Sequence, residues 1–358
     1  MKLINICDIV NIRTSEIRNY ISTENMLPNK GGVCEAANVP SGTVIEYKVG
    51  DILISNIRPY FQKIWRADRN GGCSADVLCI RAKENVDSKY LYYLLSQQAF
   101  FDYVISGAKG CKMPRGDKKQ IMQWPVTLPP LEEQRRIAGI LGALDDKIEL
   151  NRRINANLEA QAQALFRSWF VDFEPFRDGP FVDSQLGKIP QGWKVGTLSE
   201  IGDVIGGGTP SKIVPEYYTD NGIAWITPKD LSTNNCKFTS KGETDISELG
   251  YKNSSAKLMP RGSVLFSSRA PIGYISIAKN EICTNQGFKS IVPKKAGICF
   301  IYYFLRNNTS KIESMASGST FKEASGGLMK SLEVIIPSNN ILTAFEEAIQ
   351  PLFNMQEH

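Results

Sequence analysis

The most chemically suggestive stretch of this sequence is a short run that is crowded with cations. Residues 109–119 read KGCKMPRGDKK, in which one acid stands against five basic side chains: Lys109, Lys112, Arg115, Lys118 and Lys119. Two glycines and a proline favour a loop at this place. A cationic loop can follow a phosphate backbone or enter a groove of a nucleic acid. A solubilising surface loop is the alternative interpretation.

A second group of candidate DNA-contacting residues follows runs that predict β-strands. Arg58, Tyr60 and Lys63 come after GDILIS, and Arg269 comes after GSVLFS. An arginine just beyond the end of a strand can reach a guanine edge with two hydrogen bonds. A salt bridge to a nearby acid is the alternative. Weaker candidates lie in GGGTPSK and AWITPKDL, and they are Lys212, Trp225 and Lys229.

The two strand-like runs belong to one pattern that occurs twice in the chain. Gly50–Tyr60 matches Gly262–Ile272, and four further blocks match in the same order, with offsets between 208 and 212 residues. Five ordered matches indicate an internal duplication. The counterpart of the cationic loop is SGSTFKE at 317–323, which contains Thr320 and Lys322. Because both copies carry a polar, cation-bearing loop at the same place, nucleic-acid binding is favoured over simple solubility.

Each copy is expected to fold as a mixed α/β domain. Short β-rich runs at Asp51–Ile57 and Val264–Ser268 alternate with turn residues. Aromatic runs at Tyr90–Leu95 and Phe300–Leu305 have apolar residues at helical spacing and predict buried helices. PVTLP at 125–129 and EVIIP at 333–337 each predict a closing strand before a helix.

Between the two copies, residues 131–172 predict one long amphipathic helix. Its apolar residues recur at alternating spacings of three and four, as in a coiled-coil seam, and only Asn151 and Asn155 interrupt them. Forty helical residues span roughly 60 Å, enough to separate two domains. An exposed seam of this length needs a covering partner. The expected partner-binding residues are Ile137, Leu141, Leu144, Ile148, Leu158, Leu165 and Trp169.

Part of this cover is expected to come from residues 339–353, and the rest from another protein or from the same helix of a second chain. The whole chain then divides into five segments: a recognition domain at 1–130, the central helix at 131–175, a linker at 176–187, a second recognition domain at 188–337, and a shortened C-terminal helix at 338–358. The last segment is expected to be truncated, because a full copy of the central helix needs about forty residues.

The composition of the chain argues against catalysis. The only histidine among 358 residues is His358, which disfavours Ser-His-Asp and Cys-His chemistry and histidine metal sites. GGGTPSK at 206–212 has the wrong spacing for a phosphate-binding loop, and Pro210 lacks a backbone N–H. No dinucleotide or methyl-donor fingerprint is present. We therefore expect no catalytic residues, no metal site and no cofactor in this chain.

The bulk properties are compatible with a polyanionic partner. The net charge is +5 and the calculated pI is about 8.6. Eight scattered cysteines without a C-x-x-C pair are typical of a reduced, cytoplasmic protein. No run of apolar residues predicts a signal peptide or a membrane span.

Taken together, these motifs resemble the specificity (S) subunit of type I restriction-modification systems. LPPLEEQRRIAGILGALDDKIELN, at the helix start, resembles the central region of that family. IPQGWKVGTLSEIGDVIGGGTPSK, AWITPKDL and GSVLFSSRAPIGYISI resemble its target-recognition domains. The resemblance covers essentially the whole chain.

The resemblance implies a non-enzymatic subunit that recognises double-stranded DNA. Each recognition domain would read one half of a bipartite, asymmetric site, and the helices would dock two methyltransferase (modification) subunits. Restriction subunits would complete the complex, and S-adenosylmethionine, ATP and Mg²⁺ would be bound by partner subunits. A scaffold that joins two protein partners without reading DNA is the alternative from another class.

Overall fold

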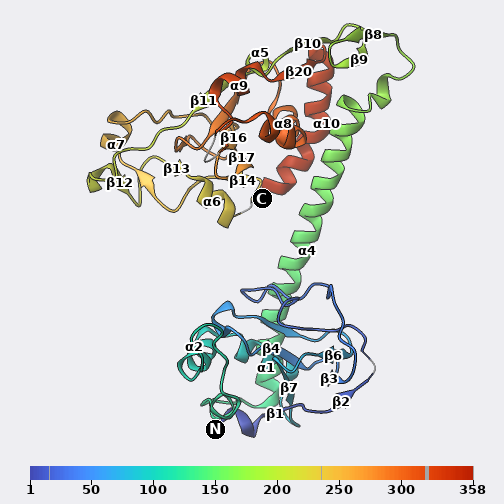
Figure 1. The fold of residues 1–358 in the computed structure, drawn as a ribbon, viewed down its shortest axis with the longest axis vertical. Coiled ribbons are helices and arrows are strands. Elements are labelled where there is room, and N and C mark those ends of the chain that lie inside the picture. Colours follow the sequence, from blue (N-terminus) through green and yellow to red (C-terminus); the bar gives the residue numbers. More distant parts are fainter. Residues whose placement is uncertain (16, 235, 319–321, 358) are drawn as a thin grey trace. The chain divides into compact units, whose positions relative to one another are not determined.

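The computed structural model describes residues 1–358 except 16, 235, 319–321 and 358, and it separates into two compact units. The first unit is Met1–Asn151 and the second is Arg152–His358. Both combine sheets with helices, which confirms the predicted mixed α/β class (Figure 1). The central helix α4 (Leu131–Phe170) is 40 residues long, beginning in the first unit and ending in the second.

The first unit is built around a four-stranded sheet of order β1-β7-β4-β5, in which every neighbouring pair is antiparallel. All four residues of the central strand β4 are buried. The strands of this sheet are β1 (Cys7–Ile9), β7 (Val77–Ala82), β4 (Ile52–Ser55) and β5 (Ile64–Arg66). A smaller sheet contains β2 (Arg13–Thr14), β3 (Val44–Tyr47) and β6 (Gly71–Cys73). The helical segments are η1 (Leu3–Asn5), η2 (Pro59–Phe61), α1 (Ser88–Leu95), α2 (Gln98–Ser106) and α3 (Lys118–Ile121).

The second unit repeats this sheet with one additional edge strand, in the order β11-β19-β16-β17-β14. These strands are β11 (Gly202–Gly206), β19 (Lys289–Pro293), β16 (Val264–Ser268), β17 (Ile272–Ala278) and β14 (Phe238–Thr239). Two-stranded pairs are β8 (Phe181–Ser184) with β9 (Gly187–Pro190), β10 (Lys194–Thr197) with β20 (Glu333–Ile336), β12 (Tyr218–Thr219) with β15 (Asp245–Ile246), and β13 (Trp225–Ile226) with β18 (Cys283–Thr284). The helical segments are η3 (Glu174–Phe176), α5 (Leu198–Ile201), η4 (Pro215–Tyr217), α6 (Pro228–Thr233), α7 (Glu248–Lys252), α8 (Ile298–Met315), α9 (Gly326–Ser331) and α10 (Asn339–Glu357).

The predicted duplication is visible in the backbone as well as in the order of the strands. β4 lies between β7 and β5, and β16 lies between β19 and β17. The glycines that precede these strands, Gly50 and Gly262, have φ values of +91° and +86°. Their N–H groups donate to the carbonyls of Ala67 and Ala278, each at 2.9 Å. Glycine reaches such a conformation without steric cost, which explains why both copies carry this residue just before the strand.

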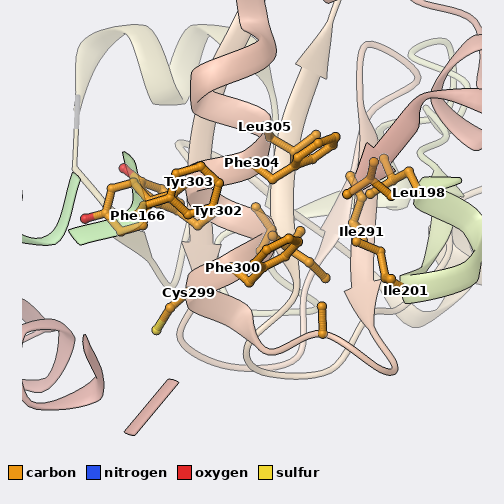
Figure 2. Close-up of a cluster of buried hydrophobic side chains, with 14 of the residues drawn as sticks. Phe166, Leu198, Ile201, Ile291, Cys299, Phe300, Tyr302, Tyr303, Phe304 and Leu305 are labelled. Atoms are coloured by element: carbon orange, nitrogen blue, oxygen red, sulfur yellow. The ribbon is translucent and has the colours of Figure 1, made fainter. Parts of the chain in front are cut away.

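The C-terminal half of α4 is packed into the core of the second unit. Figure 2 shows Phe166 of α4 beside Tyr302 and Tyr303 of α8. The rings of Phe170 and Phe345 lie 4.7 Å apart, and the side-chain amide of Gln356 donates to the carbonyl of Asn155 at 3.1 Å. These two contacts show that α10 pairs with α4 in an antiparallel direction. The prediction that residues 339–353 cover part of the seam is therefore confirmed.

A buried charge cluster joins α4 to the rest of the second unit. The Nζ of Lys237 lies 2.9 Å from Oε2 of Glu159 and 3.4 Å from the centre of the Phe353 ring. Glu159 also accepts from the Tyr303 hydroxyl and from Arg306. Burial lowers the pKa of Lys237 to about 8 against the opposing effect of Glu159. Burial alone would raise the pKa of Glu159, but the surrounding cations and hydroxyl hold it below its ordinary value.

The structure corrects three expectations about local structure. α4 ends at Phe170, and Phe173 has a φ of +52°, so the helix does not reach residue 175. The expected linker at 176–187 contains β8 and the beginning of β9, which form a hairpin. PVTLP at 125–129 is not a full strand: Pro125 forms an isolated bridge with Lys2, and Val126 exchanges backbone hydrogen bonds with Met1 at 2.9 Å. Among the described residues, no helix is long and apolar enough to cross a membrane.

Replacing Glu159 by glutamine is expected to destabilise the second unit by about 3 kcal/mol at pH 7, because buried Lys237 loses its anionic partner. The folded-state pKa of Glu159 lies below its ordinary value of 4.5. Its charge therefore stabilises the fold fully above that value, and the contribution is lost as the pH falls through the lowered folded-state pKa. Urea unfolding of both proteins at pH 7 and pH 3 measures the difference.

Glu149→Gln on an exposed position of the same helix is the control and should change the unfolding free energy by less than about 0.5 kcal/mol. An equal loss for Glu159→Gln at both pH values would contradict the role assigned to the charge.

Candidate nucleic-acid interface

The cationic loop of the first unit is held by backbone hydrogen bonds against the turn that follows β4. Lys109 and Arg115 each donate an N–H to the carbonyl of the other at 2.9 Å, which closes the loop. The N–H of Arg58 donates to the carbonyl of Pro114 at 2.8 Å, and that of Gly116 donates to Asn56 at 3.1 Å. We call residues 56–58 and 109–116 the first clamp. It unites two motifs that lie some fifty residues apart in sequence.

The second unit contains the same arrangement. The N–H of Glu323 donates to the carbonyl of Ser317 at 2.9 Å, and that of Ala324 donates to Ser268 at 2.9 Å. Arg269 pairs with Glu323 as Ile57 pairs with Arg115. Arg58 and Ala270, the next residues along the chain, both have a φ of +51°. Residues 268–270 with 317–318 and 322–324 form the second clamp, and the predicted contact Thr320 lies outside the described residues.

The five cations of the first clamp and its flank divide into paired and unpaired side chains. Lys109 lies 2.9 Å from Asp117, and Arg115 lies 3.0 Å from Asp76. The Lys109 ammonium and two backbone N–H groups hold the pKa of Asp117 below its ordinary value, and Asp117 caps the N-terminus of α3. The remaining cations are exposed, and in the described part of the chain their side chains make no hydrogen bond or ion pair: Lys112, Lys118 and Lys119.

The three candidates that follow β4 have different surroundings. Arg58 is half-buried, and its Nε has no partner among the described atoms. Tyr60 is 48% exposed, with its ring 4.7 Å from that of Phe61. Lys63 donates from Nζ to the carbonyl of Thr23 at 2.7 Å, so its ammonium is engaged within the unit. Arg58 therefore belongs to the clamp with a buried, unpartnered Nε, and Tyr60 lies next to the clamp with an exposed side chain.

Four predicted contacts of the second unit line one cavity of about 720 Å³, and they are Lys212, Trp225, Lys229 and Arg269. Lys229 lies 2.6 Å from Glu243, and Arg269 lies 3.4 Å from Glu323, so both cations have acidic neighbours. Lys212 and Lys322 are exposed. The salt-bridge alternative is thus realised for Arg269, which also lines the cavity.

The structure corrects one weaker prediction and adds two residues to the site. Trp225 is only 6% exposed and donates from Nε1 to the carbonyl of Gly208 at 2.9 Å, so, although it lines the cavity, it is a buried residue and not an exposed DNA-contacting one. Asn285 and Gln286 also line the cavity. In the sequence they belong to one of the repeated blocks, CTNQGFKSI at 283–291. Nothing in that block indicates which of its polar side chains are exposed.

The predicted partner-binding seam of α4 is open only in its middle part. Ile137 packs against the core of the first unit. Leu158 is buried, and Leu165 and Trp169 pack against the core of the second unit. The exposed members of the seam are Leu141, Leu144 and Ile148, at 37%, 55% and 49% exposure, and the exposed Ile140 extends the same apolar surface.

Comparison with known proteins shows which family has these features. The family model described as "Type I restriction modification DNA specificity domain" matches residues 14–160 and 190–350, once in each unit. The chain belongs to this family. It is the DNA-recognition component of a type I restriction-modification system and not a catalytic one, and such components act with DNA, methyltransferase and restriction partners.

Individual relatives agree with this membership. The chain is 39% identical over 180 residues to the type I restriction enzyme MjaIX specificity subunit of Methanocaldococcus jannaschii, covering 48% of this chain and 41% of that protein. It is 28% identical to the HindI specificity subunit of Haemophilus influenzae, covering 93% of this chain and 87% of that protein. The fold resembles the crystal structure of the type I S subunit from M. genitalium, with a TM-score of 0.60, 13% identity, and coverage of 100% of this chain and 91% of that one.

Replacing Gly116 by alanine is expected to destabilise the first unit by about 1–3 kcal/mol through overpacking of the clamp. A Cβ atom there would lie 2.8 Å from Oδ1 of Asn56 and 3.0 Å from side-chain atoms of Val104 and Ile121. Denaturant unfolding measures the loss. Gly139→Ala is the matched control, because a Cβ on that helical glycine meets nothing within 4 Å and should stabilise by up to about 1 kcal/mol. Two substitutions with the same effect would contradict the packing argument.

Proposed function

We propose that this chain reads a bipartite DNA site, one half with each unit, and that each clamp is the point of contact. The observation that carries the proposal is the repetition of one backbone arrangement, at 57, 109 and 115 and again at 269, 317 and 323, with different side chains on it. A shared backbone gives both units the same way of approaching a duplex. Different polar side chains give the two half-sites different sequences, so the site is asymmetric.

Exposed cations in and beside the clamps supply the affinity in this proposal. Lys112, Lys118 and Lys119 in the first unit and Lys212 and Lys322 in the second are exposed. Such side chains bind phosphates and release counterions, and these contacts position the protein without reading bases. Base reading is assigned to Arg58 and Arg115 of the first clamp with the neighbouring Tyr60, and to Arg269 of the second clamp with Lys229, which lines the same cavity. Lys63 and Lys109 support the loops through their contacts within the unit.

The open middle of α4 is the proposed docking surface for two methyltransferase subunits. Leu141, Leu144 and Ile148 form an apolar surface that nothing in the described part of the first unit covers. An exposed apolar strip of this kind on a helix marks a protein interface. S-adenosylmethionine, ATP and Mg²⁺ are then bound by the methyltransferase and restriction subunits. The alternative is that a second copy of this chain binds the same strip.

The DNA role is tested by the salt dependence of binding. Replacing Lys112 and Lys119 by alanine should reduce the slope of log K against log[salt] by roughly 0.9 for each phosphate contact that is lost. The measurement is fluorescence anisotropy of labelled duplex with the full chain and its methyltransferase subunits. Lys188→Ala, in the β8–β9 hairpin, removes one exposed lysine away from the clamps; it is the control and should leave the slope unchanged. An unchanged slope for the double variant would assign the loop to solubility, and absence of DNA binding by the native complex would favour the scaffold alternative.

The docking surface is tested by polar substitutions on α4. Leu144→Gln with Ile148→Gln should weaken association with the methyltransferase subunit at least tenfold, because both side chains are exposed members of the seam. Leu150→Gln is the matched control, since Leu150 is 54% exposed but lies away from the seam. Analytical ultracentrifugation of mixtures and of the chain alone measures both equilibria. If only self-association responds, the strip binds a second copy of the chain instead.

A further inference from the structure

One short turn is built identically in both units and lies directly beside each clamp. In the first unit it comprises residues 74–76, and in the second it comprises residues 285–287. The N–H of Ser74 donates to the carbonyl of Ile21, and that of Asn285 donates to the carbonyl of Ile226, both at 2.9 Å. The side chain of the first residue caps each turn, since Ser74 accepts from the N–H of Asp76 and Asn285 accepts from that of Gly287.

Each turn is also bonded to the residue that begins its clamp. The N–H of Asn56 donates to the carbonyl of Asp76 at 2.9 Å, and the N–H of Ser268 donates to that of Gly287 at 2.7 Å. The middle residue of each turn is exposed. In the first unit this residue is Ala75, whereas in the second it is Gln286. The same rigid position therefore carries a methyl group in one unit and an amide in the other.

The amide of Gln286 is held in place by the glycine-rich segment that the sequence excluded as a phosphate loop. A Cβ on Gly207 would lie 2.0 Å from the carbonyl oxygen of Asn285, so only glycine lets this segment press against the turn. The N–H of Gly208 donates to the carbonyl of Thr284 at 2.9 Å. The next residue, Thr209, donates its hydroxyl to Oε1 of Gln286. The glycines thus place a hydrogen-bond donor where it fixes the orientation of the glutamine amide.

We propose that Gln286 is a base-reading residue of the second unit and that its ligand is the major-groove edge of an adenine. This assignment rests on the proposed function of the clamps. A glutamine amide can donate to N7 and accept from the N6 amino group of adenine. The carbonyl oxygen has two lone pairs, so it can accept from Thr209 and from the base together. The Nε2 group makes no hydrogen bond in the described part of the chain.

Thr209 is a positioning residue in this account, because it acts through Gln286 rather than on the base. Arg269, Lys212 and Lys229 line the same cavity as Gln286, so cations for neighbouring phosphates or guanine edges are close at hand. The alanine at the matching position of the first unit cannot form the same pair of hydrogen bonds. An adenine read in this way is therefore expected in only one half-site.

The test is selection of bound duplexes from a randomised library by the full chain with its methyltransferase subunits, followed by affinity measurements on single-base variants. The native complex should select two separated motifs. Gln286→Ala should reduce the preference for adenine at one position of one motif by roughly tenfold and leave the other motif intact. Gln286→Glu should shift that position toward cytosine, whose amino group donates to a carboxylate, a change that misfolding cannot produce.

Two further variants separate the positioning role from a general effect. Thr209→Val should weaken the same adenine preference, and Thr209→Ser, which keeps the hydroxyl, should retain it. Gln163→Ala, at an exposed glutamine of α4 in the same unit, should leave both motifs unchanged. Two outcomes would overturn the assignment of Gln286 but not the proposed function. In the first, Gln286→Ala and Gln286→Glu both select the native motifs in both half-sites. In the second, these variants lose affinity equally for all sequences. Selection of no motif by the native complex would overturn the proposed function, and the assignment with it.

Discussion

The backbone pairing between each clamp loop and the turn after the central strand is the constraint on which the rest of the site depends. Two backbone hydrogen bonds close each loop, and further ones attach it to the turn. Because these hydrogen bonds join backbone atoms, the pairing fixes the loop largely independently of its side chains. The side chains on the two clamps are consequently free to differ. This separation of a fixed frame from variable polar groups suits a protein that must read two unlike sequences.

The same division between frame and function applies to the central helix. Its first turns are tied to the first unit through Gln134, which is 1% exposed and bonds to the backbone of Pro129 and Asp87. Its last turns are tied to the second unit by aromatic rings and by the charge cluster of Glu159 and Lys237. Only the segment between these anchors keeps exposed apolar residues. The seam that looks continuous in sequence thus packs into a core at both ends and stays exposed in the middle.

The sequence predicts the duplication, the fold class and the long helix, because these depend on periodicity and on glycines with special backbone conformations. It also places Arg58 and Arg269 next to the clamps. It does not distinguish Lys112 from Lys109, because the ion pair with Asp117 depends on how the loop closes. It misses Gln286, whose importance comes from a contact with Thr209 that lies 77 residues away in the chain. Trp225 remained a weak candidate for DNA contact in the sequence because burial by tertiary contacts leaves no local signature.

The central claim is that two copies of one clamp read two separate stretches of DNA. Footprinting of the native complex on a duplex that carries its selected site, at single-nucleotide resolution, tests this claim most directly. The account predicts two protected stretches with different sequences, separated by base pairs whose identity does not affect binding. A single continuous protected stretch would contradict this reading of two separate stretches. So would the disappearance of all protection when only one of the two clamps is removed.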